Sequence, residues 1–149
     1  MTRSKIVWKQ SILIYIGIVS FFFVMKVFGL DNIVQLRALN FIFVFFGINK
    51  AIKLNIINNG EVDYLSNFSL AILTAVTALI MVILSLVIYL DFIDPGFLEV
   101  MEQVRVWGAQ IDVLMVAFGI AVEGFASSVI ISFILMQYWK RRSVDLIPQ

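Results

Sequence analysis

One carboxylate lies inside a long apolar stretch near the C-terminus and is the first candidate for chemistry. The stretch runs from Val113 to Trp139, and Glu123 is its only charged residue. A helix that crosses a bilayer core of about 30 Å needs about 20 apolar residues, so this stretch spans and Glu123 lies near mid-depth. A carboxylate at that depth costs at least about 2.5 kcal/mol. We therefore expect Glu123 to face other helices rather than lipid.

Two roles for Glu123 remain open at this point. It can bind a proton or a cation, or it can make a structural hydrogen bond that fixes helix packing. Matching depths along the spans places Thr74 and Thr77 close to its level. Asn40 and Arg37, three residues apart on one helix face, lie nearer the outer surface. Arg37 can pair with Glu123 or extend to the interface as an ordinary basic residue at a helix end.

The remaining polar residues offer weaker candidates. Asp91, Asp94, Glu99 and Glu102 form two i, i+3 pairs that could supply oxygen ligands to a divalent cation, or simply form a solvated helix face. Ser127 and Ser128 could be nucleophiles only beside a general base, but the chain has no His and no Cys and its lysines lie at helix ends. No phosphate-binding glycine loop or metal-spacing motif occurs. We predict no enzyme activity and no cofactor.

Composition determines the class of protein that must position these residues. The chain has 149 residues, of which 62% are hydrophobic, and a net charge of +1. This is too apolar for a soluble domain of this size and is typical of a single membrane-embedded bundle. The near-neutral charge gives no indication of nucleic-acid binding. The lipid bilayer is the first partner that the composition predicts.

The pattern of apolar runs predicts an all-α integral membrane protein with four spans. They cover about residues 7–28, 36–57, 65–90 and 111–139. The basic start of the first segment could belong to a signal peptide, but no small-x-small cleavage site follows, which favours an uncleaved helix. The second segment has a short uncharged middle, so a buried re-entrant segment is its alternative.

Further predictions concern one face of the third span and the segment between the third and fourth spans. Ala71, Thr74, Ala75 and Ala78 share one face of the third span, with Ser85 beyond them, and small residues let helices approach closely in lipid. Between the third and fourth spans, apolar residues recur at helical spacing over about residues 95–107. Asp94 followed by proline is typical of a helix start. A short amphipathic helix is expected there, on the membrane surface or over the bundle.

Basic residues predict the orientation. With both termini in the cytoplasm of a bacterial cell, more basic residues face the cytoplasm than face the outside of the inner membrane, as the positive-inside rule requires. Those inside are Arg3, Lys5, Lys9, Lys50, Lys53, Lys140, Arg141 and Arg142, and those outside are Lys26, Arg37 and Arg105.

Three stretches resemble a known family. They are Phe41–Lys53 (FIFVFFGINKAIK), Ile88–Glu99 (IYLDFIDPGFLE) and the basic end at 140–142. The chain resembles a four-helix membrane domain of unknown function from Bacteroidetes-type bacteria from about Phe41 onwards. It departs from that pattern in a shorter loop after Glu99 and in Asn49, where a lysine is often found. The resemblance implies a fold and no activity, so no site residue follows from it.

Two functional hypotheses follow. The first is a non-enzymatic protein that associates with further copies of itself, as a homo-oligomer, or with other membrane-protein subunits. The alternative is a channel or carrier subunit in which Glu123 handles a proton or a cation. A wetted polar cavity around Glu123 favours transport, and a dry hydrogen-bonded contact favours association.

Overall fold

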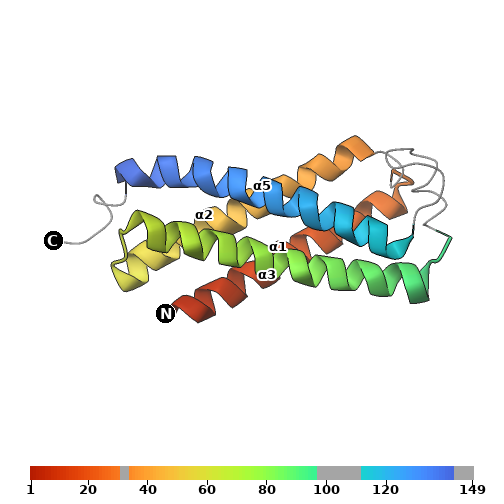
Figure 1. Cartoon of the computed structure of the whole chain (residues 1–149), viewed down its shortest axis with the longest axis horizontal. Helices are drawn as coiled ribbons and strands as arrows, with labels where there is room; N and C mark the ends of the chain where they lie inside the picture. Colours follow the sequence, from red (N-terminus) through yellow and green to blue (C-terminus); the bar gives the residue numbers. More distant parts are fainter. Residues whose placement is uncertain (31–33, 97–111, 143–149) are drawn as a thin grey trace.

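Four long helices make up the structure, a computed structural model that describes residues 1–30, 34–96 and 112–142, with only the backbone given at 34, 35 and 37. The helices are α1 (Arg3–Val27), α2 (Asn40–Asn59), α3 (Tyr64–Ile88) and α5 (Val113–Arg142), and each is long and apolar enough to cross a membrane (Figure 1). A 3₁₀ turn at Val34–Leu39 leads into α2, and a π turn at Tyr89–Ile93 extends α3. No strand occurs in the described ranges. The predicted all-α class with four spans is confirmed.

The first helix begins at the same end of the bundle where the last helix ends. The start of α1, the turn between α2 and α3 and the end of α5 lie at one end of the bundle, which we call the terminal end (Figure 1). The 3₁₀ turn and the π turn lie at the other, which we call the far end. Helix α2 runs between the two ends, so it crosses the bundle, and it is long and apolar enough to cross a membrane.

The amphipathic helix expected over about residues 95–107 is not supported. Pro95 and Gly96 form a turn, and residues 97–111 lie outside the described part of the chain. Asp94, expected at the start of that helix, accepts a hydrogen bond from Lys26 Nζ at 2.7 Å through its carboxylate oxygen Oδ2, and the π turn brings the Asp94 amide back to the Tyr89 carbonyl at 2.9 Å.

Helices α1 and α3 run parallel in a constant register. Arg3 Nη2 donates to the Ser66 carbonyl at 3.2 Å, and Ser11 Oγ donates to the Thr74 carbonyl at 2.8 Å. Lys26 donates to the Tyr89 hydroxyl at the far end. Each of these pairs is 63 residues apart in sequence. Three bonds with the same offset, spread along the helices, fix their alignment from one end of the bundle to the other.

The turn between α2 and α3 is held by polar side chains that are buried at the terminal end. Gly60 ends α2 with φ 64°, a left-handed conformation that glycine adopts without steric cost. Asp63 begins α3 by accepting from the Ser66 amide at 2.8 Å. Asn55 donates to Asn67 at 3.0 Å, and Asn67 in turn donates to the Glu61 and Asp63 carbonyls. These bonds satisfy two amides that are almost fully buried.

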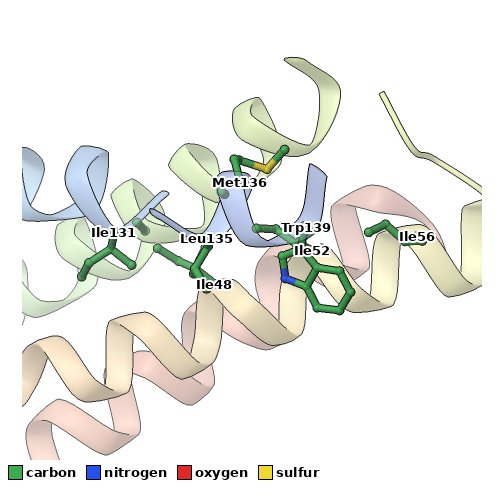
Figure 2. Packing of buried hydrophobic residues seen from close by; sticks show 9 residues of the cluster. Ile48, Ile52, Ile56, Ile131, Leu135, Met136 and Trp139 are labelled. Carbon is green, nitrogen blue, oxygen red and sulfur yellow. The ribbon is translucent and has the colours of Figure 1, made fainter. Parts of the chain in front are cut away.

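The largest core cluster of the described residues also lies toward the terminal end, because its α5 members are in the last part of that helix. Figure 2 shows how its side chains pack. The cluster joins Ile48, Ile52 and Ile56 of α2 to residues of α5, and α3 adds small residues beneath them. The α5 members are Ile131, Leu135, Met136 and Trp139. The predicted small-residue face of α3 is confirmed, since Ala71, Thr74, Ala75 and Ala78 are all at most 3% exposed.

Candidate functional site

A pocket of about 90 Å³ lies among the four helices, in the part of the bundle where α2 begins. Its wall is largely apolar, with Phe41 and Val44 from α2, Ala78 and Leu79 from α3, and Ile18 from α1 among the lining residues. Its polar residues are Asn40, Glu123, Ser127 and Ser128. A water molecule needs about 10–15 Å³ of such volume, so the pocket has room for several.

The pocket exists because α2 and α5 are in close contact only over part of their length. Toward the terminal end, Trp139 Nε1 donates to Asn49 Oδ1 at 2.8 Å and the isoleucine cluster fills the space between the helices. Beyond that cluster, Asn40 and Glu123 line a shared cavity instead of a packed core. The two helices therefore have a filled half and an open half.

Glu123 is exposed in the single chain. Its carboxylate makes no hydrogen bond and no ion pair with any described residue. The adjoining serines do not serve it either, because Ser127 Oγ donates to the Glu123 carbonyl and Ser128 Oγ to the Gly124 carbonyl, both at 2.6 Å. Hydroxyls that bond to a carbonyl four residues earlier are common within helices. Neither serine hydroxyl therefore pairs with the Glu123 carboxylate in the described structure.

Asn40 shows the same lack of a partner on the opposite side of the pocket. Its Oδ1 atom is buried and has no hydrogen bond within the described residues. A buried carbonyl-type oxygen without a donor costs roughly 1–3 kcal/mol. Together with the carboxylate and the two serine oxygens, whose protons are already used, it gives the pocket a set of acceptors, and Asn40 Nδ2 is a donor beside them. Such a set is satisfied by a donor, namely a proton on Glu123, water or a cationic group.

The structure separates the other residues predicted to surround Glu123. Thr74 Oγ1 donates to the Leu70 carbonyl at 2.8 Å, and Thr77 Oγ1 donates to the Leu73 carbonyl at 2.7 Å. Neither threonine lines the pocket. Matching depths predicted the level of each threonine but not the direction in which its side chain points. Arg37 lies in the 3₁₀ turn, and its side chain is outside the described part of the structure.

Small residues flank Glu123 on α5. Gly119 and Ser127 lie one turn before and after it, and both are half-buried, while Ala126 is exposed. Gly124, the next residue, faces α3, where a Cβ atom would come within 2.5 Å of Leu79 Cδ1. The side of α5 that carries Gly119, Glu123, Ala126 and Ser127 is called the Glu123 face below.

A second polar cluster, at the far end, was not predicted from the sequence. Lys26 pairs with Asp94 at 2.7 Å and lies 4.8 Å from the centroid of the Tyr89 ring, whose hydroxyl donates to Asp94 at 3.1 Å. The cluster ties α1 to the end of α3. Of the acids proposed as cation ligands, Asp91 is exposed, Asp94 is in this ion pair, and the other two lie outside the described residues. No group of three metal-ligating side chains occurs in the part of the chain that the structure describes.

Comparisons of the chain with protein-family models, curated proteins and solved structures find no match. The resemblance to a four-helix family of Bacteroidetes-type bacteria therefore stays a prediction. The site has to be interpreted from its own geometry.

Proposed function

We propose that the chain is a non-enzymatic subunit of an assembly in the membrane, formed with further copies of itself or with another membrane protein. The observation that carries this proposal is Glu123, an exposed carboxylate without a partner among the described residues. It lies about 15 Å along α5 from Val113, well inside the apolar span. Because exposure to acyl chains at that depth is costly, a second protein surface that covers it is favoured.

The Glu123 face has the shape that such a contact needs. Helices associate in lipid through close packing and interhelical hydrogen bonds rather than through a hydrophobic driving force, so small side chains at the contact are an advantage. Gly119 and Ala126 provide that close approach on either side of the carboxyl group. The exposed carboxyl then supplies the polar contact.

A second function is favoured by the acceptor-rich pocket. A carboxylate that lines the same cavity as the unbonded Asn40 Oδ1, with room for water, is suited to hold a proton or a small cation. In this alternative the chain is part of a channel or carrier. Four helices enclose little space, so a conducting pathway also needs several copies.

We place the protein in the inner membrane of a bacterium, with both termini in the cytoplasm. The support is the excess of basic residues at the terminal end, where the described part of the chain carries Arg3, Lys5, Lys9, Lys50, Lys53, Lys140, Arg141 and Arg142.

Light scattering of the protein purified in mild detergent tests the assembly. We expect the parent to be larger than one chain, and Ala126→Phe to reduce it to the monomer by blocking close approach at the Glu123 face. Leu114→Phe is the matched control, since Leu114 is 72% exposed on the same helix but, nine residues before Glu123, lies on the opposite side of α5. A monomeric parent, or equal loss of assembly in both variants, would contradict the proposal.

Glu123→Gln separates the two functions. It retains hydrogen-bonding groups but does not titrate, so the assembly should persist unchanged. Proton- or sodium-dependent flux into liposomes that the parent shows and Glu123→Gln lacks would instead support the channel or carrier alternative.

A further inference from the structure

Five cations lie where α2 and α5 come together at the terminal end of the bundle. They are Lys50 and Lys53 on α2 and Lys140, Arg141 and Arg142 on α5, and all five are exposed. We call this group the basic seam. It is separate from the Glu123 face and plays no part in the function proposed above.

A hydrogen bond holds the two halves of the basic seam at the same level. Trp139 donates to Asn49 at 2.8 Å, and the two helices run in the same direction, from the far end to the terminal end (Figure 1). Lys50 directly follows Asn49, and Lys140 directly follows Trp139. Packed side chains around Trp139 and Ile52 fill this part of the contact (Figure 2). Cations from two helices are thereby collected at one depth.

The described acids near this end do not neutralise the basic seam. Asp63 caps α3 through the Ser66 amide, and Glu61 accepts from the Asp63 amide at 3.2 Å. The ion pair found within the described residues, Lys26 with Asp94, lies at the far end of the bundle. Among the described residues, no carboxylate pairs with a cation of the seam.

Exposed apolar side chains continue from these cations toward the membrane interior. Phe46 is 61% exposed and lies one helical turn before Lys50 on the same side of α2. On α5, exposed Ile134 is followed at the same spacing by Tyr138 and then by Arg142, whose Nη1 donates to the Tyr138 hydroxyl at 2.6 Å. Each helix thus presents an apolar surface that ends in a cation, which matches an acyl chain that ends in a phosphate.

We propose that the basic seam binds the phosphate of an anionic phospholipid, whose acyl chains lie along Phe46 and Ile134. A lipid is favoured over a free phosphate because the apolar and basic surfaces are continuous along both helices. Basic residues beside a membrane span attract anionic lipids through the charge of the headgroup layer.

Native mass spectrometry of the full chain, titrated with phosphatidylglycerol or phosphatidylcholine of the same acyl chains, tests the proposal. We expect phosphatidylglycerol to bind more tightly. Lys50→Gln together with Lys53→Gln should weaken that binding on the order of 30-fold, since each cation near an anionic surface contributes roughly fivefold. Lys5→Gln with Lys9→Gln is the matched control, because both lysines are exposed at the same end of the bundle but belong to α1.

Three results would overturn the proposal. Equal affinity for the two lipids would show that the headgroup charge is not recognised. Equal weakening by the two double variants would show that net charge matters and the position of the seam does not. Displacement of the lipid by inorganic phosphate at the same concentration would show that a free phosphate is bound without the help of the apolar surface. Circular dichroism of each variant verifies that the helices are retained.

Discussion

The same two helices, α2 and α5, line a packed core in one half of the bundle and, in the other, a largely apolar pocket that contains four polar residues. Toward the terminal end, buried isoleucines surround Trp139, and its indole proton has an acceptor in Asn49. Further along, Asn40 and Glu123 line a cavity in which neither has a partner among the described residues. The difference shows that the largest described core cluster stabilises one half, while the other half holds polar groups without described partners that are available for a further contact.

The largest effect should come from removing Trp139. Its side chain is 6% exposed in the main cluster, and loss of a buried aromatic side chain in soluble proteins typically costs about 3–5 kcal/mol. We expect Trp139→Ala to lower the free energy of unfolding by about 3 kcal/mol in an SDS titration from mixed micelles.

Phe46→Ala is the control for that measurement. Phe46 is also aromatic and lies on α2, but it is 61% exposed, so its removal should change the free energy of unfolding by less than about 0.5 kcal/mol. A similar loss for both variants would mean that the terminal half is not the stabilising part of the structure.

A smaller effect should distinguish the two asparagines of α2. Asn49→Ala leaves the indole proton of Trp139 without its acceptor, and we expect a loss of about 1 kcal/mol. Asn40→Ala removes a buried oxygen that has no donor within the described structure, so stability should stay the same or rise slightly.

The same unfolding titration measures both asparagine variants. If Asn40→Ala costs as much as Asn49→Ala, then Asn40 has a partner in the folded protein, and the contrast between the two halves of α2 and α5 fails.

The sequence was sufficient to predict what depends on local composition. Four apolar runs gave four helices, and the helical spacing of alanines gave the buried face of α3. Asp94 shows what local reasoning leaves out. Its carboxylate pairs with Lys26, 68 residues earlier, and only the parallel register of α1 and α3 brings the two side chains together.

The candidate site was predicted only in part, because it too depends on contacts between segments that are distant in sequence. Glu123 and Asn40 line one pocket, although depth matching placed Asn40 nearer the outer surface, and depth does not specify the direction in which a side chain points. Thr74 and Thr77 were matched to Glu123 by level, and each hydroxyl donates to a carbonyl four residues earlier in its own helix. The bond between Trp139 and Asn49 likewise depends on tertiary packing that no short-range pattern encodes.

The central claim is that another protein surface covers the Glu123 face, and photo-crosslinking in intact membranes tests it most directly. A benzophenone side chain would replace Ile130 or Phe125, which are both large and at least half exposed on α5. Ile130 lies two turns from Glu123 on the same side, and Phe125 points to the opposite side. We predict a crosslinked protein band from position 130 and crosslinking to lipid alone from position 125. The absence of a protein band at position 130, or equal bands at both positions, would contradict the account.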